Sequence, residues 1–325
     1  MRKLKRQGVK SKHNEQKTAI TNKTANLTLK DMHRIFIRYK KADGMSQRTI
    51  DDYEKTFGYF LDYLDGNDVN RNDLTPDLFL DYKTFLIEKY SPNTVNVRLR
   101  TMHAFLKFCY EEGYINEALN MYVKKVRAPI DNLEALEVEE IERLIGTVSR
   151  YSSEWFTDFR NKVIILTLLD SMARVSELMQ AKRRNLNLEE GILYLEGSTV
   201  KTRQGRAVPL SYKTCKLLSE LLRETADFDS DLIFLTYTGT ELTSNTVRAF
   251  LRDYAKEAGI NKQVSPHVLR HTGALFYIMN GGDPFSLQKI LGHKDMSMTR
   301  RYVQMASANV KDRHENFSPL NGLAL

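Results

Sequence analysis

Apolar residues recur at helical spacing through the first third of the chain. Between residues 29 and 108 they fall three or four positions apart in four successive stretches, a spacing that places them on one face of an α-helix. Turn and capping signals separate the stretches, namely Asp43-Gly44, Asp65-Gly66, Thr75-Pro76 and Ser91-Pro92. The pattern therefore predicts an all-helical unit over residues 27–127, in which four helices bury one core.

The pattern changes after this unit. A helix with an acidic polar face is expected from Leu133, and residues 159–169 are so apolar that they predict a buried helix at the centre of a second unit. Residues 186–210 read as short strands with a hairpin tip at residues 200–206. Helical spacing returns further on, so the whole chain is predicted to be mainly α with a small antiparallel β-sheet.

Helix boundaries are clearest near the C-terminal end. Ser265 and Pro266 are expected to be the N-cap and first residue of one helix. Asp283-Pro284 should begin a second, short helix, which Gly292 ends. These boundaries fix which polar side chains can share a face.

Four side chains in this segment have the chemistry to act together on one bound group. His267 and Arg270 lie three positions apart and share a helix face, and Tyr302 follows nine positions after His293, on a helix expected to be capped near Ser297. Arginine offers a planar fork of donors that suits phosphate. Histidine can exchange a proton near neutral pH, and a tyrosine hydroxyl can be a covalent nucleophile. The set indicates phosphoryl-transfer chemistry without a metal.

The same residues also have ordinary explanations. His267 and His271 are four positions apart, as in zinc-binding helices, but no acid lies between them and no cysteine pair completes a site. His271 is therefore expected to be a packed helix residue. Tyr302 by itself would be one core aromatic among 16 tyrosines, and its spacing from His293 is what favours a functional role.

Composition narrows the class of protein. The 325 residues suit about two domains, with 42 % hydrophobic and 28 % charged residues. No apolar run reaches the roughly 18–20 residues of a membrane span. Cys109 and Cys215 are too few for a disulfide scaffold. We therefore expect a cytoplasmic protein in a reducing compartment.

The net charge of +8 is concentrated at the start of the chain. Residues 1–23 carry eight lysines and arginines against Glu15, so the remainder is nearly balanced. This predicts a basic, flexible arm over residues 1–26, which either binds phosphate backbones non-specifically or is a solvated terminus. If the rest of the chain binds nucleic acid, its basic residues must gather on one face.

The ordered motifs resemble those of the tyrosine recombinases, the phage integrase family. S-P-H-V-L-R-H, then L-G-H, then Tyr302 is similar to that family's C-terminal signature, and S-M-A-R-V-S-E-L, which contains Arg174, is similar to its T-G-x-R-[IV]-S-E-L. The turns into the second and fourth helices are also similar to those of the family's core-binding domain. Met172 stands where the family usually has glycine. Because methionine tolerates positive φ poorly, we expect a different turn or a displaced Arg174.

The resemblance implies a fold and a mechanism. It implies a SAM-like, four-helix core-binding domain and a catalytic domain that close around DNA as a C-shaped clamp. Tyr302 would attack a DNA phosphate, the arginines would hold its oxygens, a lysine would protonate the leaving oxygen and His267 would be the base. No metal or other cofactor is required. The implied catalytic set is Arg174, Lys201, His267, Arg270, His293 and Tyr302.

Basic and polar residues near helix starts, in the linker and on the hairpin are candidates for DNA contact. Helix N-termini with Arg or Lys are good phosphate-contacting elements. For each one the alternative is a solvated helix face or an exposed basic turn. The candidates are Arg48, Asn93, Asn96, Arg98, Arg100, Lys124, Lys125, Arg203 and Arg206.

The predicted organisation is an arm, two domains and a tail. The boundaries are a core-binding domain at 27–127, a linker at 128–132, a catalytic domain at 133–312 and a C-terminal tail at 313–325, which in this family commonly docks on a neighbouring subunit. The alternative is that the tail folds back on its own domain.

The predicted function is site-specific DNA recombination through a 3′-phosphotyrosyl intermediate. The resemblance implies double-stranded DNA as partner, a homodimer on one site and a homotetramer in the synapse, within a bacterial or phage setting at the nucleoid. An accessory directionality protein is left open as a further partner. The alternative function is a DNA-binding regulator that keeps the fold without cleaving, which Met172 favours and the complete set of six residues opposes.

Overall fold

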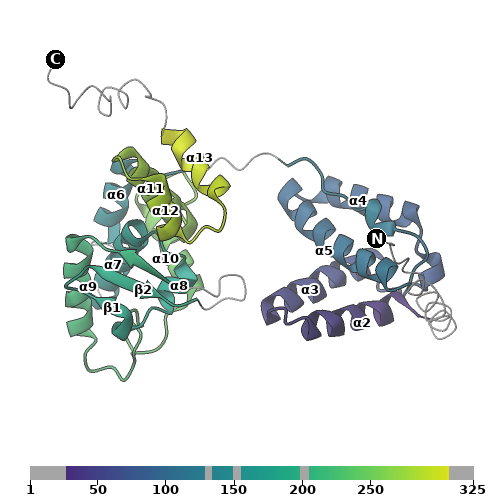
Figure 1. Ribbon diagram of the computed structural model, residues 1–325, viewed down its shortest axis with the longest axis horizontal. Helices are drawn as coiled ribbons and strands as arrows, with labels where there is room; N and C mark the ends of the chain where they lie inside the picture. The colour runs from purple at the N-terminus through teal and green to yellow at the C-terminus, as the bar shows by residue number, and fades with distance from the viewer. Residues whose placement is uncertain (1–26, 129–133, 149–154, 198–204, 307–325) are drawn as a thin grey trace, which may run out of the picture. The chain divides into compact units, whose positions relative to one another are not determined.

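The computed structural model describes residues 27–128, 134–148, 155–197 and 205–306 (Figure 1). Its contacts divide the chain into two compact units, Met1–Asp131 and Asn132–Leu325. Across the described ranges, none of the helices combines the length and apolar character needed to cross a membrane.

The first unit is helical throughout its described residues. Side-chain oxygens of Thr28, Ser46 and Thr75 cap three of the helices by accepting hydrogen bonds from backbone amides of the first turn. The fourth helix begins at Pro92 as the Ser91-Pro92 signal predicted, without a side-chain cap bond from Ser91. The four expected helices are thereby confirmed. They are α2 (Leu29–Ala42), α3 (Gln47–Tyr63), α4 (Pro76–Lys89) and α5 (Pro92–Glu111), with the 3₁₀ turns η1 (Arg71–Asp73) and η2 (Leu119–Met121).

Aromatic rings fill the core of the first unit. Phe36, Phe60, Tyr82 and Phe105 are almost completely buried. The rings of Phe36 and Phe105 meet edge to face at 5.6 Å, and those of Phe60 and Tyr82 at 4.7 Å, a geometry that the ring quadrupoles favour. Helix α5 packs against α2, α3 and α4, so it is the central helix of this unit.

The second unit combines helices with a small antiparallel sheet. The sheet order is β1 (Leu186–Asn187), β2 (Ile192–Leu195) and β3 (Arg206–Pro209). The predicted mainly α fold with a small antiparallel sheet is therefore confirmed. The helices are α6 (Val138–Val148), α7 (Trp155–Ser171), α8 (Val175–Met179), α9 (Tyr212–Glu224), α10 (Ser244–Glu257), α11 (Pro266–Met279), α12 (Pro284–Leu291) and α13 (Met296–Ala306), with the 3₁₀ turn η3 (Arg183–Asn185).

One helix boundary differs from the prediction. The helix expected from Leu133 begins at Val138 instead. The preceding residues run along α11, where the amide of Leu136 donates to Thr272 Oγ1 at 2.9 Å. This hydrogen bond satisfies the backbone outside the helix, which helical periodicity alone does not reveal.

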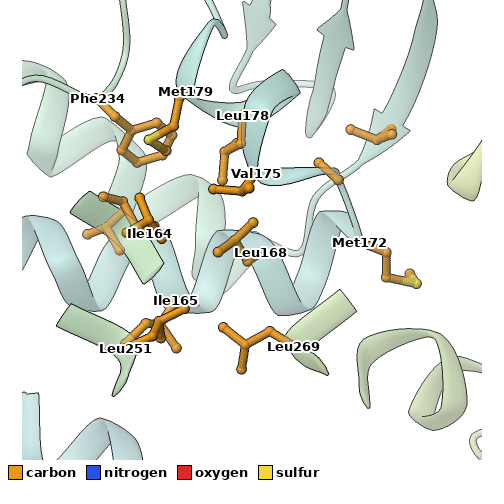
Figure 2. Close-up of a cluster of buried hydrophobic side chains, with 14 of the residues drawn as sticks. Ile164, Ile165, Leu168, Met172, Val175, Leu178, Met179, Phe234, Leu251 and Leu269 are labelled. Atoms are coloured by element: carbon orange, nitrogen blue, oxygen red, sulfur yellow. The ribbon is translucent and has the colours of Figure 1, made fainter. Parts of the chain in front are cut away.

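Helix α7 lies at the centre of the second core, as its apolar sequence predicted (Figure 2). Its Ile164, Ile165 and Leu168 are fully buried. Helix α11 approaches α7 closely because residue 273 is glycine: a Cβ there would lie 2.2 Å from the carbonyl oxygen of Leu169. This close approach places α11 beside the turn that follows α7.

That turn contains Met172, in the left-handed conformation at φ +50°. Met172 therefore takes the positive φ that methionine was expected to tolerate poorly. Its side chain is only 4 % exposed, and its Cγ lies 3.0 Å from where a Cβ on Gly273 would be. Burial of the side chain offsets the left-handed backbone, which costs about 1–2 kcal/mol for a non-glycine residue.

We expect Met172→Gly to destabilise the second unit by about 1–3 kcal/mol, because the lost burial exceeds the relieved backbone strain. Urea unfolding followed by the fluorescence of Trp155, the single tryptophan of the chain, would measure this unit alone. Met172→Leu is the matched control: it keeps the burial and should cost less than about 1.5 kcal/mol. A Met172→Gly variant more stable than the parent would contradict the explanation.

Candidate active site

Helix α11 carries three neighbouring residues of the site. Its start is as predicted, with Ser265 Oγ accepting from a backbone amide one turn later and Pro266 as the first residue. His267, Arg270 and His271 follow on the first two turns. The rings of His267 and His271 meet edge to face at 4.1 Å, so both lie on one side of the helix.

Arg270 is fixed by two backbone carbonyls. It is 3 % exposed, and its guanidinium donates to the carbonyl oxygens of Met172 and Leu291, each at 2.7 Å. Burial, followed by the nearby charges of Arg174 and Arg206, lowers the pKa of Arg270 to about 10, so it stays positive at neutral pH. The turn after α7 and the end of α12 thereby hold one fixed positive charge.

Glu177 organises two further arginines. Its carboxylate accepts from the Arg174 guanidinium at 2.9 Å and from Arg206 through two bonds at 2.9 and 2.8 Å. Burial acts to raise the pKa of Glu177, but hydrogen bonds and charge from Arg206 and then Arg174 lower it to about 2. The Arg174 side chain remains 40 % exposed, so Glu177 orients its guanidinium while the side chain stays accessible.

His293 connects Arg270 to α13. Gly292 ends α12 at φ +64°, the left-handed conformation that glycine adopts without strain, and delivers His293 into a turn as predicted. The imidazole Nε2 lies 3.3 Å from an Arg270 guanidinium nitrogen and Nδ1 lies 3.1 Å from Thr299 Oγ1. Arginine can only donate, so Nε2 is the acceptor. Burial, followed by the charges of Arg270 and Arg174, lowers the pKa of His293 to about 4.

Tyr302 lies on α13, which packs against α11 and α12 (Figure 1). The Asp295 carboxylate accepts from the Ser297 amide at the start of this helix, so the cap is Asp295, close to the predicted position. Tyr302 is 2 % exposed and its hydroxyl contacts His271 Nδ1. Burial raises the pKa of Tyr302, and the charges of Arg270 and Arg301 oppose this shift. The phenol is therefore protonated at neutral pH in the free protein.

These residues surround one cavity of about 190 Å³. None of the described residues that line it is a carboxylate, and the surrounding arginines and histidines suit an anion of phosphate size. The described residues contain no cluster of three or more His, Cys, Asp or Glu side chains that could hold a metal ion. The cavity brings together all the predicted catalytic residues except Lys201. Lys201 and Arg203 lie outside the described residues. The lining residues are Arg174, His267, Arg270, His271, His293, Met298, Arg301 and Tyr302.

Three of the residues predicted to contact DNA have partners within the protein. Asn96 exchanges two hydrogen bonds with the backbone of Val126, at 3.0 and 2.8 Å. Arg98 is 9 % exposed, with its guanidinium 4.0 Å from each of two flanking tyrosine rings, Tyr59 and Tyr90.

Arg206 is the third. Besides Glu177, its guanidinium donates to the carbonyl oxygen of Ile290 at 2.7 Å, and the side chain is 14 % exposed. It therefore braces the residues around the cavity from within the protein, and its predicted contact with a backbone phosphate stays a prediction. The remaining described candidates, which are exposed, are Arg48, Asn93, Arg100, Lys124 and Lys125.

Two features of functional interest were not predicted. The first is the contact of His271 with the Tyr302 hydroxyl, since His271 was expected to be a packed helix residue. The second is a basic face of α2, where exposed side chains spaced by three or four positions line a hollow of about 480 Å³. That spacing was a usable signal in the sequence. The basic residues of this α2 face are Lys30, Arg34, Arg38 and Lys41.

The two units and the arginine-, histidine- and tyrosine-lined cavity define the class of the two-domain tyrosine recombinases. Residues 134–309 match the model of the phage integrase family, and residues 28–125 match the phage integrase SAM-like domain. The chain belongs to the phage integrase family, as a two-domain, Xer-like tyrosine recombinase.

A relative of similar sequence and two solved structures of similar fold can be compared with this chain. The chain is 27 % identical over 291 residues to tyrosine recombinase XerD of Listeria innocua, an alignment that covers 85 % of this chain and 94 % of the relative. Its fold matches a lambda integrase dimer bound to a COC′ core site with a TM-score of 0.71 at 18 % identity, covering 88 % of this chain and 79 % of that one. A lambda integrase tetramer bound to a Holliday junction matches with a TM-score of 0.69 at 19 % identity, over 86 % and 81 %.

Proposed function

We propose that this protein is a site-specific DNA recombinase that cleaves and rejoins DNA through a 3′-phosphotyrosyl intermediate. The observation that carries the proposal is the cavity in which the Tyr302 side chain meets three arginines and three histidines. A phosphodiester is an anion with two non-bridging oxygens, and arginine recognises such groups through paired donors.

The proposed reaction is an in-line displacement at phosphorus. The Tyr302 oxygen forms a bond to phosphorus while the bond to the 5′ oxygen breaks. The phenolic proton passes to His267 as general base, and Lys201 gives a proton to the 5′ oxygen, which leaves as a hydroxyl. Reversal of the same steps on another strand rejoins the DNA, so the covalent intermediate conserves the bond energy.

Electrostatic stabilisation comes from groups already in place. Arg270 is fixed by two carbonyls and Arg174 is oriented by Glu177, so little reorganisation is needed when charge builds on the non-bridging oxygens. A bound phosphate would also favour the protonated form of His293, whose pKa the surrounding cations depress in the free protein. His293 would then donate to the same phosphate.

Double-stranded DNA is the proposed partner, held by both units in a clamp. The exposed candidates of the first unit and the basic face of α2 would contact the backbone. The lambda integrase relatives form a dimer on a core site and a tetramer on a Holliday junction. We extend the same assembly to this chain, a dimer on one site and a tetramer in the synapse. The C-terminal tail, proposed to dock on a neighbouring subunit, lies outside the described residues.

The test is a covalent adduct. A genome-wide pull-down recovers the DNA fragments that bind the protein. These fragments are then synthesised with a nick beside each candidate cleavage point. After cleavage the short end diffuses away, so the covalent intermediate is trapped. We expect a protein–DNA adduct that survives denaturant, with the nucleotide attached to the peptide that contains Tyr302. Tight, sequence-specific binding without an adduct on any of these substrates would instead support a non-cleaving regulator. Met172 was the residue that favoured this alternative. The turn that contains Met172 nonetheless leaves Arg174 lining the cavity.

We expect Arg270→Lys to slow adduct formation by about a hundredfold to a thousandfold, the usual effect of removing one transition-state donor. Lysine keeps the charge but cannot span two carbonyls and a phosphate with a planar fork. Single-turnover kinetics on the trapped substrate would measure the rate. Arg300→Lys, an exposed neighbour on α13 outside the cavity, should cleave at the parental rate. Equal rates for both variants would contradict the role given to Arg270.

A further inference from the structure

The nearest hydrogen-bonding group to the nucleophile is one that the proposed mechanism does not use. The Tyr302 hydroxyl contacts His271 Nδ1, and the two rings lie 5.6 Å apart at 39°. Among the described residues no hydrogen bond joins Tyr302 to His267, the proposed base. His271 therefore determines where the hydroxyl points before DNA binds.

The direction of this hydrogen bond follows from the protonation states. Burial and then the charges of His267 and Arg270 lower the pKa of His271 to about 4, while burial raises the pKa of Tyr302. A neutral imidazole faces a neutral phenol, so one of them donates. A phenol O–H is more acidic than the N–H of a neutral imidazole, and an imidazole nitrogen accepts a hydrogen bond better than a phenol oxygen does. The hydroxyl therefore donates to Nδ1, and Nε2 carries the imidazole hydrogen.

We infer that His271 is a positioning residue for the recombination reaction: in the DNA-free site it accepts a hydrogen bond from the Tyr302 hydroxyl and so turns the oxygen lone pairs toward the phosphorus. The hydrogen then passes to His267, whose ring lies 4.1 Å from that of His271, as the oxygen attacks. His271 and Tyr302 line the same cavity as the arginines, so this orientation is set where the phosphate would bind. His271 is itself fixed by its neighbours, because Arg270 precedes it in the helix and the His267 ring packs on its edge. The inference rests on the proposed function.

Two substitutions separate hydrogen bonding from packing. His271→Phe keeps a planar ring but removes the acceptor. His271→Asn keeps an acceptor, since the asparagine Oδ1 lies close to the place of Nδ1. On the trapped substrate we expect His271→Phe to form adduct about ten to a hundred times more slowly, with unchanged DNA affinity, because a misdirected nucleophile loses rate rather than binding. His271→Asn should recover to within a few-fold of the parent.

A second measurement tests the contact without any catalysis. His271→Phe should lower the melting temperature in the parent and lower it less in a Tyr302→Phe background, where no buried hydroxyl is left unpaired. Equal shifts in both backgrounds would show that the contact does not exist in solution. An unaltered cleavage rate in His271→Phe, or equally slow cleavage in both His271 variants, would overturn the positioning role. If the parent forms no adduct at all, the proposed function fails, and the melting shifts still decide whether His271 holds Tyr302.

Discussion

Tyr302→Phe is expected to abolish covalent attachment to DNA, a loss of roughly ten-thousandfold or more, while leaving duplex affinity unchanged. The substitution removes one oxygen atom and nothing else. Phenylalanine fills the same buried space on α13, so the packing against α11 is retained. The lost group is the only one in the proposed reaction that bonds to phosphorus, and no neighbouring side chain replaces it.

The matched control is Tyr277→Phe. Tyr277 lies on α11, is partly buried and is outside the cavity, so the same atom is removed from a tyrosine of the same unit. We expect this variant to form adduct at the parental rate. Trapped-substrate gels with both variants, read beside gel-shift affinities, make the comparison. An adduct that persists in Tyr302→Phe would place the nucleophile elsewhere and remove the mechanism proposed above.

The fold was largely predictable because its signals are local. Caps such as Ser46, Thr75 and Ser265 carry their own acceptor atoms, and Gly292 can take a left-handed φ, so helix boundaries follow from residue chemistry. The boundary that failed, at Val138, depends on a hydrogen bond to Thr272, far along the chain. Periodicity contains no information about such long-range partners.

The residues of the site could be predicted from the sequence, but the contacts between them could not. Spacing and family likeness identified Arg270, His293 and Tyr302, which the structure gathers around one cavity. The sequence could not tell that Arg98 would be enclosed between tyrosines, because a buried and an exposed arginine look alike at a helix start. For the same reason it could not assign the His271 contact, which needs α11 and α13 side by side.

Glu177→Gln is expected to destabilise the second unit by about 3–5 kcal/mol at neutral pH, more than any other single change considered for this chain. The Glu177 side chain is 9 % exposed and faces two guanidinium groups, of which Arg206 is nearly as buried. Glutamine keeps the shape but leaves those cations without a carboxylate. Urea unfolding followed by Trp155 fluorescence would measure the loss in the unit that contains the site.

The pKa of Glu177 determines the direction in which this stabilisation changes with pH. The pKa of Glu177 is about 2 in the folded protein and 4.5 for the unperturbed group, so the unfolded state binds the proton first as pH falls. The stabilisation is complete above pH 4.5 and decreases as pH falls toward 2, by about 3 kcal/mol. The Glu177→Gln variant lacks this component, so the stability difference between parent and variant should shrink steadily over that range.

Glu196→Gln is the control for charge alone. Glu196 pairs with Lys182 and Arg184, but its side chain is 45 % exposed, so water replaces the lost interaction and the loss of stability should be far smaller than for Glu177→Gln. Equal effects of the two substitutions would mean that burial does not strengthen the Glu177 pairs. A Glu177→Gln protein that is as stable as the parent but cleaves slowly would assign Glu177 to orienting Arg174 alone. If stability and cleavage fall together, one carboxylate both stabilises the core beside α8 and sets the position of Arg174, the arginine proposed to contact the phosphate.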